Sequence, residues 1–72
     1  MAELTIGQAM RKARKRKGIT GKQLAERTGY HPNIVVRWEK DQTTPMITSV
    51  IDVADALGIS IDELVGHEVK NK

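Results

Sequence analysis

The sequence has no cysteine and no phenylalanine, and Tyr30 and Trp38 are its only aromatic residues among 72. The absence of cysteine excludes disulfides and thiolate metal ligands. The two histidines, His31 and His67, are far apart and do not have the spacing of a metal site. We therefore expect a domain that holds no metal and no cofactor, and that is stabilised by packing and helix caps.

Long apolar runs are also missing. The longest comprises Ile34, Val35 and Val36, which is far too short for a signal peptide or a membrane-spanning helix. The protein is therefore expected to be soluble and cytoplasmic. A chain of 72 residues is sufficient for one small domain with a limited core.

Charge is unevenly distributed along the chain. Residues 1–40 hold ten Lys and Arg against three Asp and Glu, a balance of +7, whereas residues 41–72 hold two against six, a balance of −4. Such an asymmetry is typical of a domain with one side facing a polyanion. The alternative is that residues 11–17 simply form a solvated helix face.

Helical patterns cover most of the chain, and no segment has the alternation of a strand. The expected helices are residues 5–17, 21–28, 32–40, 45 or 46 to 57, and 61–65. Three pairs have the spacing of capping boxes: Thr5 with Gln8, Thr20 with Gln23, and Ser60 with Glu63. The fold class is therefore all-α, with a compact five-helix domain over residues 1–66 and a short flexible tail over residues 67–72. In the fourth helix the residues expected to face inward are Ile47, Val50, Val53, Ala54 and Leu57.

Residues 21–40 have the pattern of two short helices that meet at a tight corner. Gly29 is expected at positive φ, where the chain leaves the first of these helices. Ala25 is small where the two helices cross. The residues expected on their shared inner face are Leu24, Tyr30, Val35 and Trp38. This is the pattern of a helix-turn-helix, whose second helix can enter a DNA groove.

The segments IGQAMRKAR, GITGKQLAERTGY, VVRWEK and VADALGISIDELVG, with Pro45 before the last, resemble the phage lambda repressor and Cro (XRE) family over residues 6–65. The resemblance implies a five-helix domain with the helix-turn-helix at the second and third helices. It also implies a transcriptional regulator, a repressor of a phage or another mobile element, that binds double-stranded operator DNA in the nucleoid without a small-molecule cofactor.

Two positions depart from the family pattern. Gly21 stands where the family often has a glutamine that binds a DNA phosphate, so that contact is in doubt. Asp41 stands where the family usually has glycine. Aspartate tolerates the left-handed conformation expected there, although less well than glycine does.

The resemblance further implies which residues contact DNA. The residues that it implies read bases are Pro32, Asn33 and Arg37, and Val36 beside them is expected to add an apolar contact. Asn33 can bond adenine bidentately, and Arg37 can do the same with guanine. Those expected at phosphates are Arg14, Lys22, His31, Lys40 and Thr43. The alternatives are that Asn33 is an exposed helix-start residue without a ligand, and that Arg37 forms a surface ion pair with Glu39 or Asp41.

Two further contacts are expected. The resemblance implies an ion pair between Arg14 and Glu39 that joins the first helix to the third. A single domain contacts only one half-site, so a homodimer is expected to read two half-sites about one helical turn apart. The apolar residues expected at the dimer interface are Ile61, Leu64, Val65 and Val69.

Two other classes of function have less support in the sequence than a DNA-binding regulator. One is a protein-interaction module, such as an antitoxin or a regulator controlled by a partner protein. An antitoxin of this kind needs a long extension, and only about seven residues follow the last expected helix. The other is an enzyme, which is not expected, because the sequence shows no nucleophile–base pair, metal-ligand set or glycine-rich phosphate loop.

Overall fold

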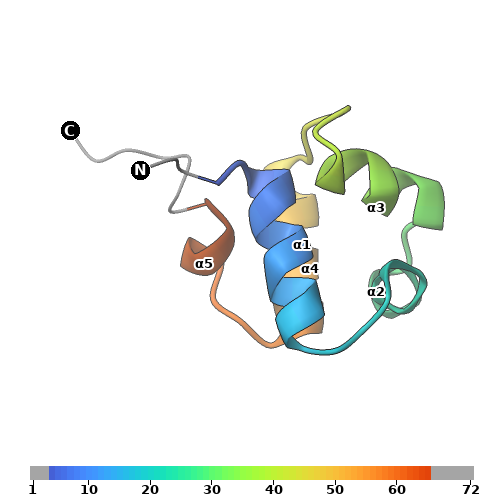
Figure 1. The fold of residues 1–72 in the computed structure, drawn as a ribbon, viewed down its shortest axis with the longest axis horizontal. Coiled ribbons are helices and arrows are strands. Elements are labelled where there is room, and N and C mark those ends of the chain that lie inside the picture. The colour runs from blue at the N-terminus through green and yellow to red at the C-terminus, as the bar shows by residue number, and fades with distance from the viewer. Residues whose placement is uncertain (1–3, 66–72) are drawn as a thin grey trace.

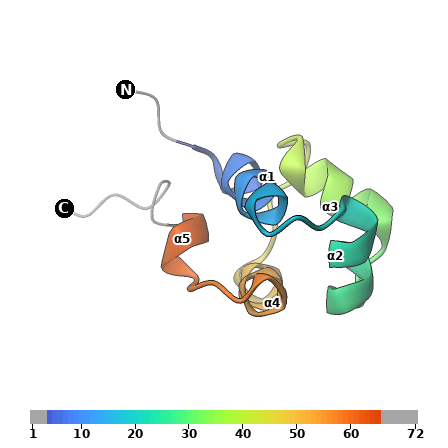
Figure 2. The same ribbon diagram turned by 60° about the horizontal axis from the view of Figure 1, so that its bottom comes forward.

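The computed structural model describes residues 4–65, which form five α-helices. They are α1 (Ile6–Arg16), α2 (Gly21–Thr28), α3 (Pro32–Glu39), α4 (Ile47–Leu57) and α5 (Asp62–Val65). Figure 1 shows α1 in front of α4 at the centre, with α2 and α3 on one side and α5 on the other. In Figure 2 α1 lies above α4, and α5 is again on the opposite side from α2 and α3. The all-α prediction is confirmed for these residues. None of the described helices is long and apolar enough to cross a membrane.

Capping boxes begin both α1 and α2. Thr5 Oγ1 accepts a hydrogen bond from the backbone N–H of Gln8 at 3.0 Å, and Gln8 Oε1 accepts one from the N–H of Thr5 at 2.9 Å. Thr20 and Gln23 make the same reciprocal pair at 3.0 and 2.8 Å. Each box satisfies two amides that a helix start otherwise leaves without a partner. These two predicted caps are confirmed.

One core draws side chains from all five described helices. Its buried members are Ala9, Met10, Ala13, Leu24, Ala25, Val35, Trp38, Val50, Val53, Ala54, Leu57 and Leu64. The inner face predicted for the helix-turn-helix is therefore confirmed, with Tyr30 partly buried against it. Four of the twelve buried members are alanines, which allow the helices that carry them to pack closely.

A close approach between α1 and α3 lies at Gly7. A β-carbon at this position would collide with the backbone carbonyl oxygen of Trp38 and would lie 2.7 Å from Oδ1 of Asp41. Gly7 is the second residue of α1, and glycine is disfavoured in a helix relative to alanine, by up to about 1 kcal/mol in the interior. Glycine is nevertheless required at this position, because no side chain fits between α1 and α3. This role of Gly7 was not predicted from the sequence.

Asp41 follows α3 and has φ +62°, a conformation that residues other than glycine rarely adopt. Its Oδ2 accepts a hydrogen bond from Thr5 Oγ1 at 3.0 Å. The carboxylate thus lies at the N-terminus of α1, where the helix dipole favours a negative charge. These contacts offset the backbone strain. The left-handed conformation predicted for this position is confirmed.

Several expectations about the second half of the chain are wrong. Ile47 does not face the core but is 59% exposed, because α4 begins at this residue and Pro45 is buried there instead. The fifth helix begins at Asp62 rather than at residue 61. Glu63 does not complete a capping box, because its Oε1 accepts a hydrogen bond from Arg16 Nη2 at 2.9 Å.

The predicted dimer residues also need correction. Leu64 is 0% exposed, so it belongs to the core of the single chain and cannot contact a partner. Ile61 and Val65 are partly buried against the same core. Val69 and the tail predicted over residues 67–72 lie outside the described residues.

Candidate nucleic-acid interface

The corner between α2 and α3 is built around Gly29. Its φ of +83° ends α2 in a left-handed conformation, as predicted, and turns the chain toward α3. The ring of the next residue, Tyr30, packs edge-on against Trp38, with centroids 5.1 Å apart and an interplanar angle of 75°. Figure 1 shows α2 almost end-on and α3 running across the view, so the two helices cross as a helix-turn-helix.

His31 caps the start of α3. Its Nδ1 accepts a hydrogen bond from the backbone N–H of Asn33 at 3.1 Å, and Pro32 occupies the first helical position. A neutral imidazole that accepts at Nδ1 carries its proton on Nε2. The exposed His31 therefore has one N–H available to an external acceptor while it also caps the helix.

Four side chains form the outer edge of α3. They are Pro32, Asn33, Val36 and Arg37, and all are exposed. Val36 is 42% exposed, although valine is an apolar residue in a chain with a small core. The structure thus brings together on one surface the four residues expected to read bases.

The polar groups on the outer edge of α3 are not used internally. Within residues 4–65, neither the carboxamide of Asn33 nor the guanidinium of Arg37 has a hydrogen-bond or ion-pair partner. The ion pair considered for Arg37 does not form, because Glu39 is bound to Arg14 and Asp41 to Thr5. A guanidinium and a carboxamide are thus left free to contact a ligand.

The ion pair expected between Arg14 and Glu39 is present. Arg14 Nε lies 2.8 Å from Oε2 of Glu39, and Nη2 lies 2.9 Å from Oε1, which is bidentate geometry. The two side chains are only 14% and 9% exposed. The hydrogen bond to Glu39 raises the pKa of the Arg14 guanidinium further above its ordinary value. The pair joins α1 to the last turn of α3 and so fixes the direction of the outer edge.

The residues expected at phosphates fall into two groups. Lys22, His31, Lys40 and Thr43 are exposed. Arg14 is largely buried, and three of its N–H groups are already used, two by Glu39 and one by the carbonyl of Ile19 at 3.0 Å. A guanidinium has five N–H groups, so two remain for a ligand. Most of the hydrogen bonds that Arg14 can donate are therefore made within the fold.

A hydrogen-bonded cluster that the sequence analysis missed holds the corner against α4. Tyr30 Oη donates to Oδ2 of Asp52 at 2.7 Å, and Ser49 Oγ donates to Tyr30 Oη at 3.1 Å. Ser49 is the one buried polar residue among those described. A serine on the apolar side of a helix was the available signal, because a buried hydroxyl needs a partner.

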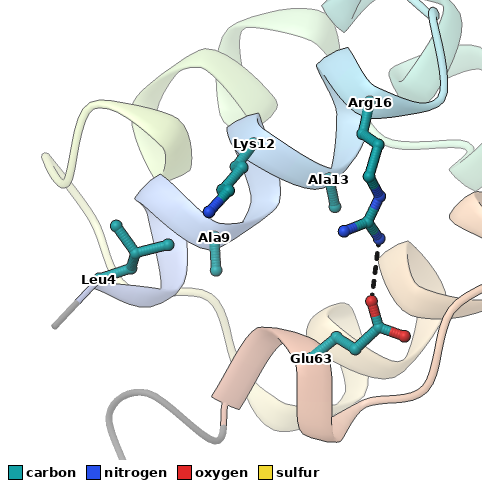
Figure 3. Close-up of a pocket in the computed structure, with 6 residues that line it drawn as sticks. All are labelled: Leu4, Ala9, Lys12, Ala13, Arg16 and Glu63. Carbon is teal, nitrogen blue, oxygen red and sulfur yellow. Dashed lines mark hydrogen bonds and ion pairs between the residues drawn. The ribbon is translucent and has the colours of Figure 1, made fainter.

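A groove between α1 and α5 has no catalytic arrangement. Figure 3 shows its lining, which consists of Leu4, Ala9, Lys12, Ala13, Arg16 and Glu63, and the ion pair between the last two. Its volume is about 120 Å³. These side chains offer cations and one carboxylate but no nucleophile with an adjacent base, so the groove does not resemble an active site.

Comparison with known proteins identifies the family. Residues 10–64 match the model of a helix-turn-helix family. The chain belongs to this helix-turn-helix family. The match runs from the buried Met10 in α1 to the buried Leu64 in α5 and so covers the core described above. The predicted resemblance to lambda repressor-like proteins is confirmed.

Individual relatives support the helix-turn-helix family on sequence and on fold. The chain is 34% identical over 65 residues to the immunity repressor protein of Bacillus phage phi105, covering 90% of this chain and 45% of that protein. It therefore spans about half the length of this relative. The restriction-modification controller protein C.AhdI of Aeromonas hydrophila superposes with a TM-score of 0.80 at 30% identity, covering 82% of this chain and 86% of that one. The P22 c2 repressor, solved in complex with a synthetic operator, superposes with a TM-score of 0.77 at 26% identity, covering 85% and 92%.

Proposed function

We propose that this helix-turn-helix protein binds double-stranded DNA in a sequence-specific manner and regulates transcription as a repressor of a phage or other mobile element. The observation that carries the proposal is the outer edge of α3, where Asn33 and Arg37 are exposed and without internal partners. The likeness to a phage immunity repressor supports the assignment to repressors. The proposal places the protein in the cytoplasm and gives it no enzymatic activity.

Sequence would be read from the major groove by the outer edge of α3. Arg37 can donate two hydrogen bonds to O6 and N7 of guanine, and Asn33 can bond N6 and N7 of adenine. Pro32 and Val36 offer only apolar surface, which suits the methyl group of thymine. The first turn of α3 is fixed by the His31 cap, so these side chains would meet the groove from a rigid helix.

Affinity would come mainly from the phosphate backbone. The exposed Lys22 and Lys40 supply cations, whereas Thr43 and the Nε2–H of His31 supply neutral donors. Arg14 has two further N–H groups for a phosphate once its internal contacts are counted. No side chain at Gly21 takes part, so the start of α2 can contribute only backbone N–H groups there.

Two copies would be needed to bind a palindromic operator. We place the contact between the two copies on a ridge of α4 formed by Ile47 and Ile51, which are 59% and 43% exposed. A spacing of four residues puts both on one side of the helix. Ser49 faces Tyr30 from the opposite side of α4, so the ridge points away from the helix-turn-helix corner. The partly buried Ile61 and Val65 are the remaining members of the predicted interface.

Selection of bound duplexes from a random DNA pool tests the proposal. We expect one enriched motif with two-fold symmetry. Arg37→Ala should cost about 1–3 kcal/mol and relax preference at one base pair in each half-site, whereas Lys22→Ala should weaken binding to all sequences alike and lower the salt slope by about one. Wild-type protein that enriches no motif would refute the function and favour a protein-interaction module.

A further inference from the structure

The outward side of α1 carries cations that the fold does not use. This helix has five Lys and Arg residues and no acidic residue. Arg14 is paired with Glu39 and Arg16 with Glu63. Within residues 4–65, the side chains of Arg11 and Lys15 have no ion-pair or hydrogen-bond partner, and both are exposed.

The arrangement of these two cations disfavours the helix on its own. Arg11 and Lys15 are four residues apart, and like charges at this spacing destabilise an isolated helix. The helix dipole favours Lys15 in the last turn of α1, but it gives no such benefit to Arg11 in the middle. An anion outside the chain would remove the repulsion.

The position of the pair on α1 indicates where that anion lies. Gly7, Arg11 and Lys15 follow one another at four-residue spacing and form one ridge of the helix. Gly7 touches the backbone of α3 at Trp38. At about 100° per residue, Arg11 lies about 40° and Lys15 about 80° around α1 from Gly7, so the pair faces outward next to the edge of α1 that adjoins α3. Lys12 and Arg16 lie on the other side and line the groove toward α5, as Figure 3 shows.

We infer that Arg11 and Lys15 bind the phosphate backbone of the duplex next to the bases that α3 reads. The inference rests on the proposed function and extends it, because it gives the protein a footprint longer than its recognition sequence. Both residues lie on α1 and not on the helix proposed to occupy the groove, so phosphate oxygens rather than base edges are within their reach. Their contribution is therefore independent of sequence and sensitive to salt.

The test compares two double variants on two duplexes. Arg11→Gln with Lys15→Gln removes the pair, and Lys12→Gln with Arg27→Gln removes the same charge from exposed positions away from α3. The short duplex holds only the motif selected by wild-type protein, and the long one adds about ten base pairs of arbitrary sequence at each end, roughly one helical turn.

We expect the Arg11/Lys15 variant to bind the long duplex at least about tenfold more weakly than wild type at 0.1 M salt, with a salt slope smaller by about two for each bound copy. On the short duplex its affinity should match that of wild type. Its thermal midpoint should stay the same or rise, because glutamine keeps helix propensity and the like-charge repulsion is gone.

Three results would overturn the inference. They are an unchanged affinity on the long duplex, an equal loss on both duplexes, and an equal loss for the Lys12/Arg27 control, which would indicate net charge alone. Failure of the proposed function is seen separately, because wild-type protein would then select no motif and neither duplex could be bound specifically.

Discussion

Among single residues, Gly7 carries the tightest steric constraint described. Alanine normally stabilises a helix interior relative to glycine, but a β-carbon at Gly7 would overlap the carbonyl of Trp38. We expect Gly7→Ala to force α1 away from α3 and to lower the free energy of unfolding by at least about 2 kcal/mol. Urea denaturation followed by the fluorescence of Trp38 measures this directly.

The same substitution at Gly21 is the matched control. Nothing lies within 4 Å of a β-carbon built there, and Gly21 is the first residue of α2. Gly21→Ala should therefore raise stability, by up to about 1 kcal/mol. If both variants shifted the unfolding midpoint in the same direction, the close contact at Gly7 would not be the reason for its glycine.

Arg14 supports a second prediction about a single residue. Arg14→Ala leaves the carboxylate of Glu39, which is 9% exposed, without its partner, and should cost about 3 kcal/mol of stability. Adding Glu39→Gln removes the stranded charge and should recover part of that loss. Thermal unfolding of both variants, together with a DNA titration in which Arg14→Ala binds more weakly, checks the prediction.

The pH dependence of this pair follows from the raised pKa of Arg14. A cation whose pKa is raised on folding stabilises the fold at every pH below its ordinary pKa and loses that contribution only above it. For an arginine this window covers the whole neutral range.

Native stability and unchanged DNA affinity in Arg14→Ala would show that the contact is dispensable.

At the scale of elements, the position of α3 depends on the contact of Tyr30 with α4. Tyr30→Phe keeps the ring against Trp38 but removes the donor to Asp52 and the acceptor for the buried Ser49. We expect a loss of about 1–2 kcal/mol in chemical denaturation. Asp52→Asn, which retains an acceptor oxygen, should cost less. Equal losses for the two variants would argue against this assignment of the bonds.

The elements also show what a sequence can and cannot predict. α1, α2 and α3 were predictable because caps and apolar periodicity agree, as at Thr20 and Gln23. The start of α4 was not predictable, because Met46 makes no side-chain cap hydrogen bond. The burial of Pro45 is what sets the edge of the core before this helix. At Glu63 two partners were possible, and the choice of Arg16 over a cap depends on how α1 and α5 are placed in space.

The candidate site likewise has features that the sequence predicts and features that it does not. The exposure of Asn33, Val36 and Arg37 follows from the helical period, and so does their common edge. The cluster of Tyr30 with Asp52 joins residues 22 positions apart, and the contact of Gly7 with Trp38 joins residues still farther apart in the sequence. Such contacts depend on the packing of whole helices, which local pattern does not determine.

For the whole molecule, the apolar ridge of α4 makes assembly testable. Ile51→Glu places a charge on the ridge and should weaken binding to a palindromic duplex at least about tenfold, because the second copy no longer assists the first. Thr48→Glu, on an exposed residue about 100° around α4 from Ile47, should have little effect. Sedimentation with DNA should show two copies per duplex for wild type and one for Ile51→Glu. A single bound copy of the wild-type protein would exclude the dimer.

The anchoring of α3 at both ends has a kinetic consequence. Its first residues are held through Tyr30 and the cap of His31, and its last turn through Arg14 and the backbone contact at Gly7. The proposed reading surface is thus held in place by contacts within the fold. Arrival at a target should therefore be limited by diffusion and by the orientation of the colliding molecules, and discrimination between targets should lie in how long each complex survives.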